Sequence, residues 1–183
     1  MKNASEIVFI LDGSGSMYPQ RKEAVDSFNA LLRGHQNRGE DALVTTVVFA
    51  DDLTVLHNRQ PIEDLYPLSY ADFQPGGCTA LLDAMGTAIS YVALSRRFEK
   101  PMDRPGRVMF FIYTDGMENA SKKFDTHRVR EMIRVQKQAG WEFHFLCSDV
   151  EALRSAEELQ CTYRIPMSRI KDAMAHFDRA MSR

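Results

Sequence analysis

Short apolar runs of strand length alternate along the chain with longer segments in which apolar residues recur at helical spacing. The short runs are rich in β-branched and aromatic residues, which is typical of buried strands. They predict strands at residues 7–11, 42–50, 53–56, 108–113, 141–147 and 162–165. Strands that alternate with helices through right-handed crossovers form a parallel sheet with helices on both faces. The sequence therefore predicts an α/β protein with a doubly wound, Rossmann-like three-layer fold and a mostly parallel six-stranded sheet.

One strand and one connection depart from this regular alternation. Asp51-Asp52 marks a tight turn, so the strand at 53–56 is predicted to be an antiparallel edge strand. Residues 57–78 carry three of the seven prolines and a pair of glycines, and they predict a long surface connection. The first helix is expected to stop near Gly34, because glycine commonly ends helices. Further helices are predicted at 81–92, 126–139, 151–159 and 168–181.

Length and composition favour one domain with an ordinary globular core. The 183 residues are 44% hydrophobic and 26% charged, and we expect a single domain over 1–183 with its core at about 5–182. A net charge of −2 gives no basic surplus for nucleic acid. No apolar run approaches bilayer length, and Asp12 interrupts the first run before it could serve as a secretory core. The three cysteines lack zinc-type spacing, so we expect reduced thiols in a cytoplasmic protein that binds no membrane.

The first predicted strand runs directly into the sequence Asp-Gly-Ser-Gly-Ser, residues 12–16. One carboxylate and two hydroxyls, spaced two residues apart, then stand at the edge of the sheet. Hard oxygen donors of this kind suit Mg²⁺, Mn²⁺ or Ca²⁺ rather than zinc. The same residue types also favour a turn followed by a helix N-cap, so the segment taken alone leaves both explanations open.

Two later segments carry matching oxygen donors. Thr79 lies in Gly-Gly-Cys-Thr-Ala-Leu before a predicted helix, and taken alone it would be a helix N-cap. Asp115 follows the strand at 108–113, and Asp115-Gly116 taken alone would be an ordinary turn. In doubly wound sheets, however, ligands bind beyond the carboxyl ends of the strands. We therefore expect Asp12, Thr79 and Asp115 to meet at one edge of the sheet.

The ordered set of Asp-x-Ser-x-Ser, then Thr, then Asp after an apolar strand resembles the von Willebrand factor A domain and its metal-ion-dependent adhesion site. The resemblance covers residues from about 5 to 180. It implies that Ser14 and Ser16 bind a divalent cation directly and that Thr79 binds it directly or through water. It also implies that Asp12 and Asp115 act through waters or by hydrogen-bonding the serines. The implied cation is Mg²⁺, with Mn²⁺ or Ca²⁺ as alternatives.

A site with only two carboxylates leaves a divalent cation electrophilic and able to accept a further ligand. The implied function is thus a protein-binding adaptor, and not an enzyme, that captures an Asp or Glu side chain of a partner at the metal. The resemblance further implies a compact, intracellular protein of bacterial type, working beside an ATPase or in an assembly system.

Two other functions are compatible with these residues. A Mg²⁺-dependent phosphoester hydrolase would use Asp12 as nucleophile or ligand, but such enzymes usually carry a second carboxylate where Ser14 stands. The phosphate-binding sequence GxxxxGK[ST] and the nucleophile motif GxSxG are both missing. A scaffold with a purely structural metal is the third possibility.

The residues around these motifs carry weaker predictions. Cys78 has no obvious His partner, so a nucleophilic role for it is disfavoured. Glu118 and Asn119 are explained by the edge of the site or by a solvated loop face, and the loop face is favoured. Tyr18, Pro19 and Gln20 are explained equally well by a rim around the site and by a helix start.

Overall fold

The computed structural model describes residues 4–147, 150–167 and 169–182. Its strands form one sheet in the order β3-β2-β1-β4-β5-β6. The strands are β1 (Ser5–Asp12), β2 (Ala42–Phe49), β3 (Leu53–Pro61), β4 (Arg107–Thr114), β5 (Glu142–Cys147) and β6 (Tyr163–Pro166). Neighbouring strands are parallel except β2 and β3, which pair antiparallel at one edge. The predicted fold class is confirmed.

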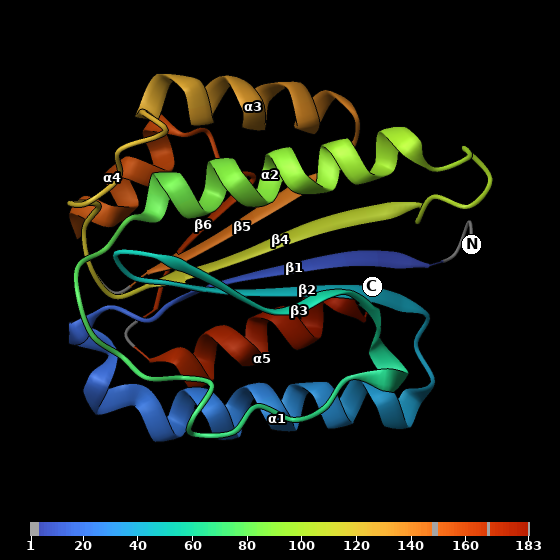
Figure 1. Ribbon diagram of the computed structural model, residues 1–183, viewed down its shortest axis with the longest axis horizontal. Helices are drawn as coiled ribbons and strands as arrows, with labels where there is room; N and C mark the ends of the chain where they lie inside the picture. The colour runs from blue at the N-terminus through green and yellow to red at the C-terminus, as the bar shows by residue number, and fades with distance from the viewer. Residues whose placement is uncertain (1–3, 148–149, 168, 183) are drawn as a thin grey trace.

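Helices cover both faces of this sheet (Figure 1). They are α1 (Arg21–Arg38), α2 (Leu81–Phe98), α3 (Thr126–Gln138), α4 (Val150–Glu158) and α5 (Ile170–Met181), with short 3₁₀ helices η1 (Gly15–Gln20) and η2 (Ile62–Asp64). Helices α1 and α5 pack on one face, whereas α2, α3 and α4 supply the core on the other. Within the described residues, no helix is both long and apolar enough to cross a membrane.

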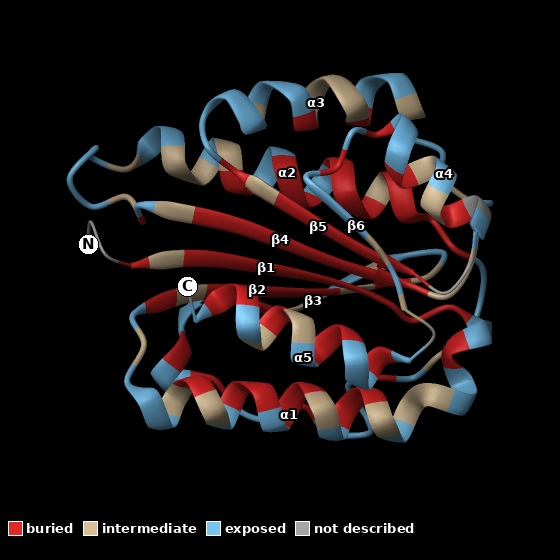
Figure 2. Ribbon diagram, turned by 180° about the vertical axis from the view of Figure 1, so that it is seen from behind, coloured by how far each residue is buried: buried red, intermediate tan, exposed pale blue. Residues whose placement is uncertain are grey.

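The central strands are buried on both faces, which explains why their sequences are apolar without interruption (Figure 2). Side chains alternate between the two cores. Phe9 and Phe111 stack at 5.6 Å on the side of α1 and α5, while Ile10 and Phe110 face the other helices. This packing holds β1 and β4 rigidly side by side, so their carboxyl ends form a fixed platform for the loops that follow.

Three predicted boundaries are wrong. Helix α2, predicted to end at 92, continues to Phe98. Helix α1 passes through Gly34 and ends four residues later, before Gly39, which adopts the left-handed conformation with φ 65°. A glycine inside a helix costs only about 1 kcal/mol, whereas the left-handed position at the helix end specifically favours glycine. Strand β3 continues to Pro61 instead of ending at 56, because its pairing with β2 resumes beyond a register shift at Thr46. The predicted start of the last helix, Ser168, lies outside the described residues.

The connection between β3 and α2 is only partly a surface segment. Leu65, Leu68 and Phe73 are buried in the core beside α1. Asn29 of α1 fixes the connection, because its side chain exchanges two hydrogen bonds with the backbone of Leu68 at 2.7 and 2.8 Å. The residues after Phe73 therefore reach the carboxyl end of the sheet from an anchored position.

Candidate metal site

The first element of the site is Asp12, the last residue of β1, whose side chain is fully buried. The backbone N–H of Ser14 donates to its Oδ1 at 2.7 Å. The hydroxyl of Thr114, at the end of β4, donates to its Oδ2 at 2.5 Å. Both carboxylate oxygens are thus oriented by neighbours from the loop after β1 and from the adjacent strand.

A chain of hydrogen bonds then joins Ser14, Ser16 and Asp115. The two serine Oγ atoms lie 3.1 Å apart, and the Ser16 hydroxyl donates to Asp115 Oδ1 at 2.5 Å. Asp115 is 99 residues from Ser16 and follows β4, so the parallel pairing of β1 and β4 brings them together. Ser14 stands at the N-cap of η1 but makes no side-chain capping bond. Ser14 therefore occupies the N-cap position through its backbone, while its hydroxyl is directed to Ser16.

Thr79 completes the group of five predicted residues. Its side chain is buried, and α2 has Ala80 as N-cap with no side-chain capping bond, so Thr79 is not the helix cap. A Cβ placed on Gly116 would lie 3.7 Å from both Thr79 Oγ1 and Ser16 Oγ. The Thr79 hydroxyl consequently approaches the same point beside Gly116 as the Ser16 hydroxyl.

Glycines allow these loops to approach each other closely. The Gly76 N–H donates to the Gly13 carbonyl at 2.8 Å, and the Gly15 N–H donates to the Gly77 carbonyl at 3.2 Å. Gly77 has φ 75°, and a Cβ there would lie 2.0 Å from Asp51 Oδ2. A side chain at this position would therefore be strained and would also clash. The sequence contains the glycine pair, but nothing local shows which carbonyl each N–H would meet.

Glu118 and Asn119 lie on a loop at the edge of the site, with Asn119 exposed, but sequence reasoning missed their hydrogen bonds to Thr79 and α2. Glu118 accepts the backbone N–H of Leu82, in the first turn of α2, at 2.8 Å and that of Ser121 at 2.8 Å. Asn119 Oδ1 accepts the Thr79 N–H at 2.9 Å, and the Asn119 N–H donates to the Thr79 carbonyl at 3.0 Å. The segment after Asp115 thus holds Thr79 in place and caps α2.

The electrostatics of Asp12 favour a bound cation. Burial raises the pKa of Asp12, the nearby charge of Asp115 raises it further, and the hydrogen bonds from Thr114 and Ser14 oppose this shift. Among the described residues, no Lys, Arg or His side chain forms an ion pair with Asp12. A divalent cation beside Ser14 and Ser16 would supply the positive charge that a buried carboxylate requires.

The donor set fits a hard cation of the size of Mg²⁺. Two neighbouring ligands of an octahedral ion at 2.0–2.1 Å are about 3 Å apart, which matches the 3.1 Å between Ser14 Oγ and Ser16 Oγ. In the part of the chain that the structure describes, no group of three or more His, Cys, Asp or Glu side chains could hold a metal. A cation at this site would therefore depend on hydroxyl oxygens together with two carboxylates.

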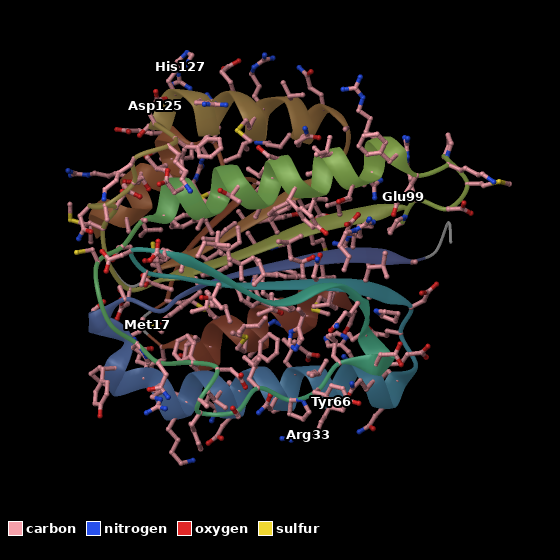
Figure 3. The ribbon with its side chains drawn as sticks, in the orientation of Figure 1. Met17, Arg33, Tyr66, Glu99, Asp125 and His127 are labelled. Atoms are coloured by element: carbon pink, nitrogen blue, oxygen red, sulfur yellow. The ribbon has the colours of Figure 1, made fainter. Side chains whose placement is uncertain are left out.

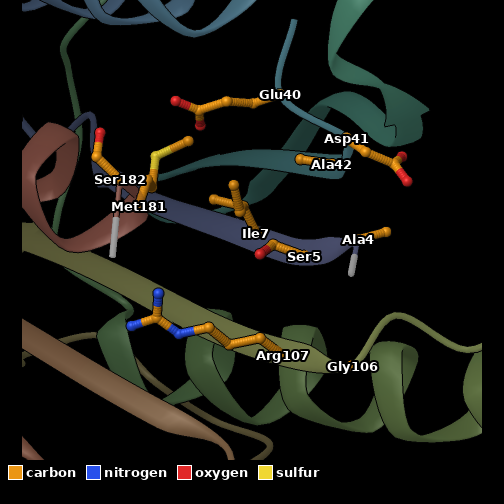
Figure 4. Close-up of a pocket in the computed structure, with 10 residues that line it drawn as sticks. All are labelled: Ala4, Ser5, Ile7, Glu40, Asp41, Ala42, Gly106, Arg107, Met181 and Ser182. Carbon is orange, nitrogen blue, oxygen red and sulfur yellow. The ribbon is translucent and has the colours of Figure 1, made fainter. Parts of the chain in front are cut away.

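Other candidate features do not contribute to the site. Cys78 is exposed next to Thr79, and a hydrogen bond with Asp51, together with that residue's negative charge, raises the pKa of its thiol. A raised pKa opposes the thiolate that a nucleophile needs. A cavity of about 530 Å³ lies at the opposite, amino end of the sheet, between Ser5, Arg107 and Met181 (Figure 4). None of the five site residues lines it.

No protein-family model matches the sequence, and no curated protein matches it. Solved structures do share the fold. The von Willebrand factor domain of the pilus tip protein Mfa5 from Porphyromonas gingivalis is 11% identical with a TM-score of 0.69, and the alignment covers 100% of this chain and 96% of that one. The pilus adhesin SpaC from Lactobacillus rhamnosus GG is 12% identical with a TM-score of 0.72, over 100% of this chain and 30% of that one.

A third similar structure is proximal thread matrix protein 1 from the mussel byssus, solved with a zinc-occupied MIDAS motif. It is 16% identical with a TM-score of 0.63, and the alignment covers 98% of this chain and 45% of the mussel protein. The chain thus spans less than half the length of the mussel protein. Identities this low establish a common fold and nothing further.

Proposed function

Because the chain has the von Willebrand factor A fold, we propose that it is a metal-dependent protein-binding module and not an enzyme. Asp12, Ser14, Ser16, Thr79 and Asp115 would hold a divalent cation at the carboxyl end of the sheet. We propose Mg²⁺, with Mn²⁺ or Ca²⁺ as substitutes, because all five side chains offer hard oxygen donors.

The observation that carries this proposal is the hydrogen-bonded chain from Ser14 through Ser16 to Asp115. Because the Ser16 hydroxyl donates its proton to Asp115, it accepts from Ser14, and each serine oxygen keeps at least one lone pair for a cation. Hydrogen bonds from Ser14 and Thr114 hold the Asp12 carboxylate, so its negative charge has a fixed position next to the serines. The hydroxyls are therefore arranged before any metal arrives.

The partner that suits this donor set carries an acidic side chain. When bound, the cation supplies an electrophilic position to which a carboxylate oxygen can coordinate. The protein contributes only two carboxylates, and Asp12 is buried, so little negative charge faces an approaching Asp or Glu. We propose an adaptor in the bacterial cytoplasm whose partner belongs to an ATPase or an assembly system, a setting supported by the family resemblance alone.

The phosphoester hydrolase is the weaker alternative. Asp12 is fully buried and both of its carboxylate oxygens are oriented by hydrogen bonds, so neither oxygen is exposed to a phosphoester.

Isothermal titration calorimetry with MgCl₂ and MnCl₂ tests the metal site. We expect binding to the unmodified chain, and at least a tenfold loss, about 1.4 kcal/mol, in Ser16→Ala and in Asp12→Asn. Ser90→Ala on the exposed face of α2 is the matched control and should bind as the unmodified chain does. Equal metal affinity in all four proteins would disprove the ligand assignment.

Carboxylate capture needs a second measurement. A labelled peptide with one Asp should bind in MgCl₂ and dissociate in EDTA, and the same peptide with Asn in place of Asp should not bind. Peptide binding that survives EDTA would contradict the metal-dependent mechanism.

A further inference from the structure

Helix α2 exposes a line of large apolar side chains to solvent. Phe98 is 82% exposed, Leu94 is 54% exposed and Tyr91 is 40% exposed. Their spacing of three and four residues places them on one face of the helix. The buried residues of α2, such as Met85 and Val92, occupy the opposite face. We call Tyr91, Leu94 and Phe98 the α2 stripe.

An apolar pocket lies beside this stripe, at the edge of the sheet formed by β3. Helix α2 packs over β1 and β2, and β3 is the next strand at the open edge (Figure 1). The pocket between this edge and the helix has a volume of about 160 Å³. Its lining includes Val47, Leu53 and Val55 of β2 and β3 and Thr87, Ala88 and Tyr91 of α2. Because Tyr91 belongs to both, the pocket and the α2 stripe form one continuous apolar surface.

The pocket and the Phe98 side chain match in size. A cavity of about 150 Å³ lined by apolar side chains binds benzene, so this pocket has room for one phenyl ring. The Tyr91 hydroxyl donates to Asn58 Oδ1, which fixes the ring that forms one wall of the pocket. Phe98 lies seven residues, about 10 Å of helix, beyond Tyr91 and projects away from the pocket of its own chain. The surface thus carries a projecting ring at one end and a pocket for a ring at the other.

We propose that a second copy of the chain covers this surface, with its α2 antiparallel to the first, so that Phe98 of each chain enters the pocket of the other. A two-fold axis with antiparallel helices brings both rings to both pockets at once, and such a reciprocal contact closes at two chains. The axis passes near Leu94, which lies between Phe98 and the pocket residues of α2.

The charges at the two ends of α2 suit this arrangement. Asp83 lies in the first turn of the helix and Arg97 lies in the last turn. Antiparallel helices place the first turn of one chain beside the last turn of the other. Opposite charges therefore meet at both ends of the contact, whereas parallel helices would bring like charges together.

The apolar area is sufficient for a dimer that dissociates on dilution. With about 150–250 Å² for a large side chain, the α2 stripe and Val55 expose on the order of 400 Å² per chain. Two copies would bury about twice this area from apolar side chains alone, which is roughly half of a standard interface of about 1,600 Å². The flanking polar residues and the strand edge supply further contact area.

Sedimentation equilibrium of the full chain, from about 1 to about 200 µM, tests the contact. We expect the average mass to rise towards that of two chains, and to do so equally in MgCl₂ and in EDTA, because the surface includes none of the five candidate metal ligands. Phe98→Ser should raise the dissociation constant about a hundredfold, because one substitution removes two equivalent contacts worth about tenfold each. Tyr66→Ser is the matched control, because Tyr66 is also 82% exposed but lies near Arg33 of α1, on the other face of the sheet (Figure 3). This control should associate as the unmodified chain does.

A charge exchange at position 94 tests the two-fold axis. Leu94→Asp should be monomeric, and so should Leu94→Lys, because two like charges would meet near the axis. An equimolar mixture of the two variants should form heterodimers, because their charges are opposite. Circular dichroism should show an unchanged fold in both variants, since Leu94 is 54% exposed.

Three results would overturn the proposal. An unmodified chain that stays monomeric over the whole concentration range would exclude a second copy as the occupant of this surface. A dimer that persists in Phe98→Ser would use another surface, such as the β3 edge alone. A mixture of the two Leu94 variants that stays monomeric would contradict the antiparallel contact.

Discussion

The two ends of the sheet each bury a carboxylate, but they surround it with different partners. At the amino end, Glu6 of β1 is fully buried and is neutralised by Arg59 at 2.6 Å and Arg96 at 3.0 Å. At the carboxyl end of the same strand, Asp12 is also fully buried but is held by the Ser14 N–H and the Thr114 hydroxyl. One strand thus carries one carboxylate with built-in counter-charges and one held by neutral donors.

The difference distinguishes a structural site from a candidate binding site. At the amino end, one arginine pairs with each carboxylate oxygen of Glu6, so the protein itself neutralises this buried charge. At the carboxyl end, neutral donors orient Asp12 but do not cancel its negative charge. An external cation could neutralise that charge. The four predictions below test this contrast.

The largest expected effect comes from removing one charge at each end. Glu6→Gln should lower the free energy of unfolding by about 3 kcal/mol, because it leaves two arginines without their buried partner. Asp12→Asn should change it by less than about 1 kcal/mol in EDTA, because the amide keeps the shape and removes a charge with no counter-ion. Urea unfolding of both variants measures this. Equal losses at both ends would refute the contrast.

Metal should stabilise the chain through the carboxyl end only. Mg²⁺ at 100 times its dissociation constant should raise the free energy of unfolding by about 2.7 kcal/mol, because it binds only the folded chain. Ser16→Ala should lose this gain. Arg96→Lys, at the amino end, should have lower stability but the same gain, since its side chain contacts Glu6 and not the site. Thermal unfolding with and without MgCl₂ would check both statements.

Acid should destabilise the chain through His144, which lies in β5 two residues after Glu142. Burial lowers its pKa from 6.5 to about 4, with Glu142 opposing the shift and His176 adding to it. His144 also stacks on Tyr163 and lies near Arg107. Because the folded chain resists protonation of this imidazole while the unfolded chain accepts it, stability is lost as the pH falls from 6.5 towards 4. The slope should be at most about 1.4 kcal/mol per pH unit.

His144→Gln should remove that slope. Unfolding free energies of the two proteins, compared across this pH range, isolate the histidine from other titrating groups. If the variant and the unmodified chain lost stability in parallel, His144 would not be the acid-sensitive group.

The smallest effect concerns the glycine pair that lets the site loops meet. Gly77→Ala should cost about 1 to 2 kcal/mol and weaken Mg²⁺ binding, because φ is 75° and the new Cβ would meet Asp51 Oδ2. Gly76→Ala has no atom within 4 Å of the new Cβ and should be nearly neutral. If chemical denaturation and calorimetry gave the same result for both variants, the loop geometry would not control the site.

Much of the architecture follows from local patterns. The β1 and β4 runs are apolar throughout because both faces are covered, and that makes them recognisable as central strands. The ends of the elements were harder to predict. Helix α1 continues through Gly34 because an interior glycine is only mildly unfavourable. Strand β3 extends beyond its apolar residues because pairing with β2 supports it. Local composition does not encode such tertiary support.

The candidate site, too, could be predicted only in part from the sequence. The rule that ligands gather at strand carboxyl ends was enough to predict that Asp12, Thr79 and Asp115 would meet. It could not show that Glu118 caps α2 from a distant loop, or that Asn119 holds the backbone of Thr79. Those hydrogen bonds join segments about 40 residues apart, and their partners are chosen by the packing of α2 against the sheet.

By itself, the sequence determined the alternating fold, the oxygen donors and their order along the chain, because periodicity and residue chemistry are local properties. Only the tertiary structure decided that Ser16 would donate to Asp115, that Asp12 would be buried among neutral donors, and that Tyr18 would remain exposed. Burial and counter-charge depend on which distant segments pack together. That packing distinguishes the structural carboxylate of Glu6 from the candidate metal ligand at the other end of the same strand.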